Sequence, residues 1–420
     1  MPSIDRLSTL PDDLIFHILS FLPTTTSVAT SILAKRWRFL WAHVPNLDLD
    51  SEVHHSVICC SDIIDKVLSL HEVQSINSFR LRFMDIFVGN EFDGWIQTLV
   101  ERNVRKIDIT LDYQFMCLPG HLFNCKTLVD LRLNHCGDIP DGGHIYLPAL
   151  KRLHLDMVFY ESDKSLPYLL LGCPVLEELI VDRFVSEPDP KVVCFYVTSS
   201  RLIKLVIRSH SCDNHYVYRV RIRTPALRYL LVKDSVSMDV SAWPLTSLTD
   251  ANINLRNKAP IGGDDVYSIS VLNFVCSLHN VRCLNLSTGL LKVCDSAFST
   301  TPIKFGNLTR LELDADWGFV SYFLENADNL EVLTISKGCI GEKRWVEPCQ
   351  VPTCLVSCLR TVTIEGFWCT EIEFEVTRYL LANAKVLERM GIYHQCHLKG
   401  EFERISKFER GSGACELVFH

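Results

Sequence analysis

The chain has 420 residues, which is enough for two or three domains or for one long repeat array. Hydrophobic residues make up 48% and charged residues 22%, so the chain is globular and can bury a large core. The formal net charge of −8 argues against a general binder of nucleic acid or of anionic membranes, because such proteins present a basic surface.

The first predicted element is an amphipathic helix over residues 10–22 (LPDDLIFHILSFL). Its apolar residues recur at helical spacing: Leu10, Leu14, Ile15, Ile18, Leu19 and Leu22. Asp12 and Asp13 fall in the first turn, where carboxylates oppose the positive end of the helix dipole. Pro23 ends the helix, and the threonines at 24–26 are candidate caps for the next one.

A second helix is predicted from about Ser27, with Val28, Ile32 and Leu33 on one side, and it merges into or bends toward LAKRWRFLW (33–41). In that stretch Trp37 and Trp41 are four residues apart and share a face, whereas Lys35 and Arg38 share another.

This stretch, LAKRWRFLW, has three interpretations. A nucleic-acid helix would use the cations on phosphates and the tryptophans for stacking, but the net charge of −8 disfavours it. A self-contained core helix is the second. We favour the third, a helical module that docks on a partner, because a unit of about 45 residues cannot bury its whole apolar surface alone.

From residue 76 onward an apolar-x-x-apolar-x-apolar unit recurs at intervals of 21 to 33 residues. Its members are INSFRL (76–81), VRKIDI (104–109), LVDLRL (128–133), LKRLHL (150–155), LEELIV (176–181), LIKLVI (202–207), LRYLLV (227–232), LTDANI (248–253), VRCLNL (281–286), LTRLEL (308–313), LEVLTI (330–335), LRTVTI (359–364) and LERMGI (387–392). Many open with a turn-like lead, as in GCPVLEEL (172–179).

The repeat predicts an α/β fold, an irregular leucine-rich-repeat solenoid. Each unit supplies one short parallel strand and then returns through an irregular or helical segment. The rival is an ordinary α/β domain, which the near-constant period disfavours. The largest gap, between 248 and 281, contains PIGGDD (260–265), which predicts an exposed loop.

In each repeat the residue between the last two apolar positions should point away from the core, onto the concave face. These residues are Arg132, His154, Ile180, Val206, Leu231, Asn252, Asn285, Glu312, Thr334 and Thr363. Ile180, Val206 and Leu231 are apolar and consecutive, and strands about 4.8 Å apart would align them in one lane. With Tyr229 beside it and a basic rim of Lys204, Arg208 and Lys233, the lane is our predicted protein-binding site. The alternative is that a neighbouring loop or the C-terminal module covers it.

The motif search predicts neither a catalytic centre nor a metal site. There is no phosphate-binding glycine loop and no nucleophile elbow, while HQCH (394–397) and the pair Cys354 and Cys358 lack the paired spacing of structural zinc. The chain has 18 cysteines, many at core-like positions such as Cys125 and Cys173, so we expect free thiols. No signal peptide or membrane span is recognisable, which predicts a location in the cytoplasm, the nucleus or both.

The stretch LSTLPDDLIFHILSFLPTTTSVATSILAKRWRFLWAHVPNLDLD (7–50) resembles the F-box of plant F-box/leucine-rich-repeat proteins. The residues from about Val351 through CLRTVTIEGFWCTEIEFEVTRYLLANAKVLERMGIY (358–393) resemble the FBD module that closes many of these chains. Thr25, Thr26 and Ser27 stand where the family often has Lys-Asp-Val. The implied domains are an F-box (1–50), a linker (51–75), leucine-rich repeats (76–350) and an FBD module (351–420).

The resemblance implies a non-catalytic receptor subunit of a ubiquitin ligase complex. The F-box would bind a Skp-type adaptor, held by a cullin scaffold with its RING protein, and the repeats would bind a target protein for ubiquitination. No cofactor, nucleic acid or membrane is implied. The implied adaptor-binding residues are Leu10, Pro11, Leu14, Ile15, Ile18, Leu19, Leu22, Pro23, Val28, Ile32, Leu33, Lys35, Trp37 and Trp41. Trp37 would also anchor the F-box core, and Lys35, Arg36 and Arg38 would form a basic rim that suits an acidic adaptor. The alternatives are a non-catalytic F-box scaffold without a degradation target and, more remotely, an enzyme.

Overall fold

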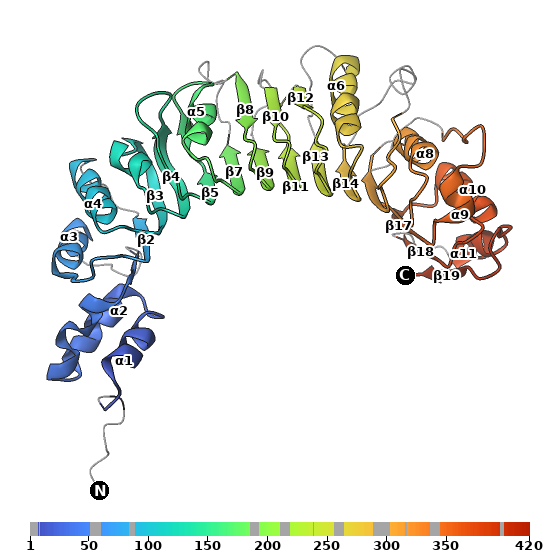
Figure 1. Ribbon diagram of the computed structural model, residues 1–420. Coiled ribbons are helices and arrows are strands. Elements are labelled where there is room, and N and C mark those ends of the chain that lie inside the picture. Colours follow the sequence, from blue (N-terminus) through green and yellow to red (C-terminus); the bar gives the residue numbers. More distant parts are fainter. Residues whose placement is uncertain are drawn as a thin grey trace, which may run out of the picture. The chain divides into compact units, whose positions relative to one another are not determined.

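The computed structural model describes residues 7, 9–50, 60–83, 89–184, 193–210, 219–237, 239–255, 264–288, 303–315, 317–336, 345–394 and 399–420. The chain divides into two compact units, unit 1 (Met1–Arg183) and unit 2 (Phe184–His420), and each is described by itself (Figure 1).

Unit 1 begins with short helices. They are α1 (Asp12–Leu19), α2 (Thr24–Ala29), and the 3-10 helices η1 (Thr30–Ile32) and η2 (Lys35–His43). Pro11 precedes α1 and Pro23 precedes α2, and the fixed φ of proline suits a chain that enters a helix. The predicted second helix is therefore wrong in its bounds: it begins at Thr24 rather than Ser27, and the extended backbone of Ala34 divides it. The threonine at 24 does not cap the helix either, because α2 has no side-chain cap.

The remainder of unit 1 is a parallel sheet with the strand order β1-β2-β3-β4-β5-β7. The strands are β1 (Asn46–Asp50), β2 (Ser78–Phe83), β3 (Lys106–Cys117), β4 (Asp130–Ile139), β5 (Arg152–Asp156) and β7 (Glu178–Phe184), and the two-residue strand β6 (Phe159–Tyr160) pairs with β4. The segments between them carry α3 (Cys60–Leu70), α4 (Gly89–Glu101), η4 (Gly120–Asn124) and α5 (Ser165–Leu171).

The segment 51–75, predicted as a linker, contains helix α3. Ile64, Val67 and Leu68 of α3 are buried, so this helix is the return segment of a repeat turn that runs from β1 to β2. The sequence pattern missed the turn because the strand NLDLD (46–50) is short and directly follows the F-box helices.

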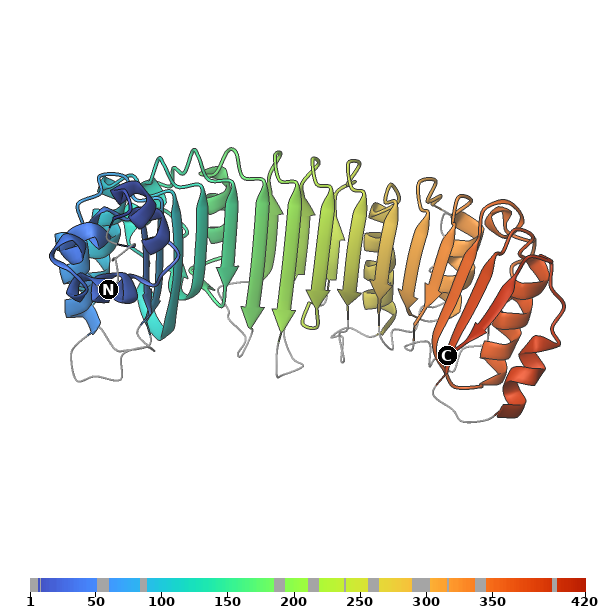
Figure 2. The ribbon, with the colours of Figure 1, turned by 90° about the horizontal axis from the view of Figure 1, so that it is seen from below.

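Unit 2 continues the same design in a parallel sheet with the order β9-β11-β13-β14-β15-β16-β17-β18-β19, whose strands run side by side in Figure 2. The strands are β9 (Lys204–His210), β11 (Tyr229–Asp234), β13 (Asp250–Leu255), β14 (Cys283–Ser287), β15 (Arg310–Asp314), β16 (Val332–Ile335), β17 (Thr361–Phe367), β18 (Arg389–His394) and β19 (Glu416–Phe419). The helices are α6 (Asp264–Ser277), α8 (Trp317–Asn326), α9 (Thr353–Ser357), α10 (Glu371–Asn383) and α11 (Lys399–Ser406).

Three consecutive turns of unit 2 return through strands instead of helices. These are β8 (Cys194–Thr198), β10 (Arg219–Arg223) and β12 (Asp239–Ala242), which pair in parallel to form a second sheet of order β12-β10-β8. In Figure 1 this small sheet lies on the same side of the main sheet as α6. The predicted helical or irregular return is thus wrong for these turns, whose two-residue alternation, as in RVRIR (219–223), is typical of a strand.

The thirteen predicted repeat strands are all present, and their registers agree with the repeat pattern. Arg132 pairs with His154 and His154 with Ile180 in unit 1, while Leu231 pairs with both Val206 and Asn252 in unit 2. The first apolar residue of each repeat lies just before the strand of that repeat and is buried. Examples are Leu150, Leu176, Leu227 and Leu308. We call the sheet face that carries His154 and Leu231 the open face, because the return segments cover the other face.

Candidate functional site

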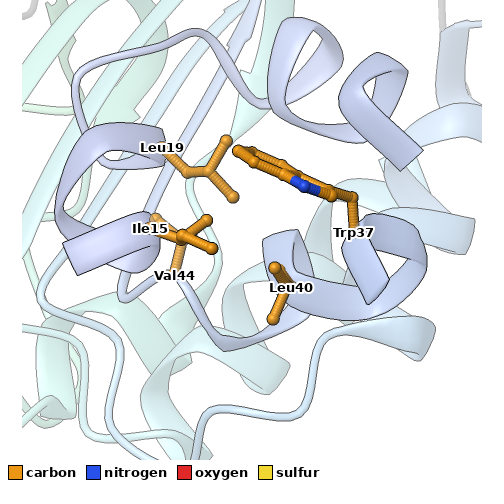
Figure 3. Packing of buried hydrophobic residues seen from close by; sticks show 5 residues of the cluster. All are labelled: Ile15, Leu19, Trp37, Leu40 and Val44. Atoms are coloured by element: carbon orange, nitrogen blue, oxygen red, sulfur yellow. The ribbon is translucent and has the colours of Figure 1, made fainter. Parts of the chain in front are cut away.

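The core of the F-box helices is built from α1, η2 and the residues just before β1. Ile15, Leu19, Trp37, Leu40 and Val44 point toward one another (Figure 3), and each is at most 8% exposed. Trp37 and Leu40 are three residues apart, a spacing that a 3-10 helix places on one side. The indole of Trp37 therefore anchors the module from inside.

Three polar contacts hold these helices in place. The Ser27 hydroxyl is buried and donates to the carbonyl oxygen of Leu19 over 3.1 Å, so the serine that departs from the family pattern joins α1 to α2. The Arg36 guanidinium donates to the carbonyl oxygen of Leu10 over 2.6 Å and to the Asp12 carboxylate over 2.5 Å. Arg36 was predicted at a basic rim for the adaptor, but its charge is directed to the start of α1.

The F-box helices are fastened to the first repeat of unit 1. The backbone N–H of Asp48 in β1 donates to the Thr24 hydroxyl over 2.7 Å, and the N–H of Glu72 donates to the Ala42 carbonyl oxygen over 2.9 Å. His71 Nε2 lies 2.8 Å from the carbonyl oxygen of Val44. Burial lowers the pKa of His71 although this hydrogen bond opposes the shift, so the ring is neutral and Nε2 is the donor.

Large apolar side chains remain exposed on the F-box helices and on the residues that follow α1 and η1. Ile32 is 88% exposed, Phe21 75%, Leu33 66% and Phe39 57%, and Leu14 and Ile18 are also exposed. We call these six residues the exposed apolar set. Large apolar side chains gathered at the surface of a small module mark an interaction site.

The structure divides the predicted adaptor-binding residues into three groups. Exposed are Pro11, Leu14, Ile18, Pro23, Ile32, Leu33 and Lys35; half-buried are Leu10, Leu22 and Val28; buried are Ile15, Leu19, Trp37 and Trp41. Residues of the last group were predicted to contact the adaptor, but their side chains fill the core and offer almost no surface to a partner. The apolar pattern of the sequence did not reveal this division, because α1 carries apolar residues on two adjacent faces and only one of these faces is buried.

Phe21 and Phe39 were not among the predicted residues. Phe21 lies seven residues after Leu14 and three after Ile18, so it extends the exposed side of α1 just beyond its last turn. Phe39 is flanked by the Arg38 guanidinium, which lies 5.6 Å from its ring centroid. The spacing of Phe21 was a readable signal, whereas the exposure of Phe39 depends on the 3-10 geometry of η2.

The open face of unit 1 carries rows of opposite charges. Asp48 and Arg80 are 3.4 Å apart on β1 and β2, and Asp130 on β4 lies 2.9 Å from Arg152 on β5. Ile180, predicted as one end of an apolar lane, is half-buried in this unit. The described outward side chains of this face are therefore largely charged and form pairs of opposite charge between neighbouring strands, which stabilises a sheet face that no described segment covers.

The open face of unit 2 holds the rest of the predicted lane. Val206 is only 4% exposed, because valine is short and the longer side chains of Lys204, Arg208 and Leu231 stand around it in the sheet register. Val206 was predicted as a contact residue, and this burial corrects that role. Leu231 and Tyr229 are half-buried and Lys233 is exposed, while the Lys204 ammonium lies 6.0 Å from the Tyr229 ring centroid.

The cysteines whose side chains the structure describes are free thiols. Burial raises the pKa of Cys136, Cys173 and Cys354 to about 12, so these thiols are protonated core residues. Within the described residues no group of His, Cys, Asp and Glu side chains could hold a metal ion; residues 395–397 of HQCH lie outside them. No helix among the described residues is both long and apolar enough to cross a membrane.

The helical module at the start, the parallel repeat sheets and the helices at the end define the class of F-box proteins with leucine-rich repeats. Three family descriptions match the chain: "F-box domain" over residues 7–49, "FBD-associated F-box protein At5g56370, LRR repeats" over 92–243, and "FBD" over 347–392. The match to the F-box family covers all six residues of the exposed apolar set.

Relatives in Arabidopsis thaliana match most or all of the chain. F-box/FBD/LRR-repeat protein At3g52680 is 30% identical over 99% of this chain and 93% of its own length. F-box/FBD/LRR-repeat protein At1g13780 is 32% identical over 100% of this chain and 98% of its own, and F-box/LRR-repeat protein At4g14103 is 35% identical over 79% and 91%. The chain belongs to the plant F-box/FBD/LRR-repeat family.

The F-box and the repeats support a role as an F-box substrate adaptor in complexes of the Skp–cullin–F-box type. An F-box domain implies binding to a Skp-type adaptor protein. F-box/LRR proteins are typically non-catalytic adaptors.

Proposed function

We propose that this chain is the target-recognition subunit of a Skp–cullin–F-box ubiquitin ligase, in which the F-box binds the Skp-type adaptor and the repeats bind the protein to be ubiquitinated. The observation that carries the proposal is the exposed apolar set. Six large exposed apolar side chains in one small module need a partner to cover them, and the F-box family supplies the identity of that partner.

The adaptor contact has apolar anchors and a polar margin. Ile32, Leu33 and Phe21 are the most exposed members of the set, and Lys35 closely follows Ile32 and Leu33 in sequence as an exposed cation. A specific contact of this kind buries about 1,200–2,000 Å² in total, and a few anchors carry most of its binding energy. The cullin scaffold with its RING protein joins through the adaptor.

The target is expected on the open face of unit 2, over β9 and β11. Leu231 and Tyr229 provide apolar contact area, and Lys204, Arg208 and Lys233 surround them with positive charge. This arrangement suits an apolar peptide with acidic flanks. The chain then acts by proximity: it raises the effective concentration of target lysines near the ubiquitin-loaded conjugating enzyme and needs no catalytic group of its own.

We place the complex in the cytoplasm, the nucleus or both, an assignment supported by the free thiols. Such thiols persist where the redox environment is reducing.

The test of adaptor binding is capture of a purified Skp-type adaptor and cullin by the full chain and by the double variant Ile32→Asp with Leu33→Asp. Loss of both captures is expected, because buried carboxylates without partners would oppose the contact. The control is Val346→Asp with Val351→Asp, which places two carboxylates on exposed valines of unit 2 and should capture normally. Normal capture by the Ile32 and Leu33 variant would contradict the proposed adaptor surface.

The test of target recognition is affinity capture with the proteasome blocked, comparing the wild-type chain with Leu231→Asp. Proteins that are ubiquitinated with the wild-type chain and lost with the variant are targets of the open face. Partners that bind without any change in their ubiquitination or amount would indicate a scaffold instead.

A further inference from the structure

The small sheet β12-β10-β8 in unit 2 has one buried face and one exposed face. Phe195, Val197, Val220, Ile222 and Val240 are each at most 2% exposed and point into the core. The alternate residues face solvent, since successive side chains of a strand point to opposite sides. Within unit 2, this sheet is distinct from the open face of the main sheet.

Three arginines occupy every outward position of the central strand β10. Arg219 and Arg223 are exposed, and Arg221 between them is half-buried. Residues two apart on a strand are separated by about 6.6 Å, so Arg219 and Arg223 stand about 13 Å apart on one line. Such a row of cations is unusual on a chain whose net charge is −8.

Within the described part of the small sheet, the one acidic side chain in register with this row is already engaged. Asp239 of β12 pairs with the Arg221 guanidinium and accepts a hydrogen bond from the Ser270 hydroxyl of α6 over 2.6 Å. The hydrogen bonds from Arg221 and Ser270 and the charge of Arg219 lower the pKa of Asp239 against its desolvation, so it stays ionised. Among the described side chains of this small sheet, one negative charge therefore faces three positive charges.

Aromatic side chains flank the arginines on both edges of the sheet. Tyr196 of β8 is exposed and lies in register with Arg221. Trp243, which directly follows β12, is 48% exposed, and the Arg223 guanidinium lies 5.9 Å from its ring centroid. The face thus combines cations with apolar contact area, which is the composition of a recognition surface for an anionic chain.

We propose that the exposed face of β8, β10 and β12 binds an extended acidic segment of a partner protein. In an extended peptide, carboxylates at positions i and i+4 lie on one side about 13 Å apart, the same separation as Arg219 and Arg223. Two such carboxylates pair with these arginines while the residues between them contact Tyr196 and Trp243. This site is independent of adaptor binding and of the open face, so it stands or falls separately from the proposed function.

The test uses the full chain and a fluorescein-labelled twelve-residue peptide of alternating glutamate and threonine with one central tyrosine, measured by fluorescence anisotropy. Arg219→Glu with Arg223→Glu should raise the Kd about tenfold or more, and Trp243→Ala should raise it severalfold. Raising the salt concentration from 50 to 300 mM, which roughly halves the screening length, should weaken wild-type binding strongly.

The matched control is Arg228→Glu with Arg282→Glu, which makes the same change in charge at two exposed arginines of unit 2 outside the small sheet. Its Kd should stay within about twofold of wild type, and circular dichroism checks that every variant is folded. Equal losses in both double variants, or equal binding of a peptide with glutamine in place of glutamate, would overturn the proposal.

Two further results would also overturn it by assigning the face to another occupant. One is tighter binding of a twelve-residue oligothymidylate, lost in the Arg219 and Arg223 variant, which would make the surface a nucleic-acid site. The other is a dimer by light scattering that the same variant dissociates, which would make the occupant a second copy of the chain.

Discussion

The F-box and the repeat strands differ in how completely they bury their apolar side chains. In the F-box, Ile32, Phe21 and Leu33 are mostly exposed, whereas the inward residues of the repeat strands, such as Leu205, Leu230 and Ile253, are fully buried. The outward positions of the strands are mainly polar or charged. Unpartnered apolar area is therefore concentrated in the module that the family uses to bind an adaptor.

The difference has a geometric cause. Each repeat strand is covered by its own return segment and flanked by the next turn, so stacking buries a continuous core. The F-box has a few short helices, and five residues from three segments already fill its interior. So small a module has no interior space for further apolar side chains, which therefore stay at its surface until a partner covers them.

The largest effect is expected from Trp37→Ala, which removes a buried side chain from the core of the F-box. Removing this buried indole should lower the free energy of unfolding by roughly 3–5 kcal/mol, which is enough to unfold the F-box helices and abolish adaptor capture. Hydrogen exchange over residues 12–44 and adaptor capture measure the two effects. Protected amides and normal capture would show that Trp37 does not anchor the module.

Phe21→Ala should leave stability almost unchanged but weaken adaptor binding. Since Phe21 is exposed, the free energy of unfolding should change by less than about 0.5 kcal/mol, whereas adaptor affinity should fall about 5- to 30-fold if the ring is an anchor. Thermal unfolding and calorimetric titration with the adaptor separate the two quantities. A variant that loses stability but not affinity would move Phe21 from the interface to the core.

The junction between the F-box and the first repeat should be sensitive to acid. The folded pKa of His71 is lowered, so below its ordinary value of 6.5 the unfolded chain binds a proton that the folded chain does not. The stability contributed by neutral His71 is therefore complete above pH 6.5 and declines as the pH falls below it.

The variant His71→Gln tests the predicted loss of stability at low pH. The variant removes the titrating group, so its melting temperature should depend less on pH between 7.5 and 5.5 than that of the wild type. The control His17→Gln, at an exposed histidine of helix α1 in the F-box, should keep the wild-type dependence. Parallel profiles for wild type and His71→Gln would exclude His71 as the source.

The smallest expected effect is that of Lys35→Glu. An exposed charge of this kind contributes about 0.2–1 kcal/mol, so adaptor affinity should fall only a few-fold, mainly through slower association. The difference from wild type should shrink as salt is added, since exposed charges are screened. A loss as large as that of Phe21→Ala would mean that charge, rather than apolar area, dominates the contact.

The sequence by itself determined the repeat sheet, because the unit apolar-x-x-apolar-x-apolar places alternate residues on opposite sides of a strand wherever it occurs. The predicted row through Arg132 and His154 in unit 1, and the row through Leu231 and Asn252 in unit 2, are in register for this reason. Local motifs also identified the F-box, since its specific residues lie within one stretch of 44.

Only the tertiary structure decided which apolar residues of the F-box are core and which are surface. Ile15 and Ile18 are the same residue type on the same helix, and only the position of η2, which brings Trp37 and Leu40 against one side of α1, buries the first and leaves the second exposed. The return strands β8, β10 and β12 depend on the same level of structure. Their alternation and the arginines of RVRIR within β10 are readable locally, but the three strands form one sheet only because successive turns stack in register.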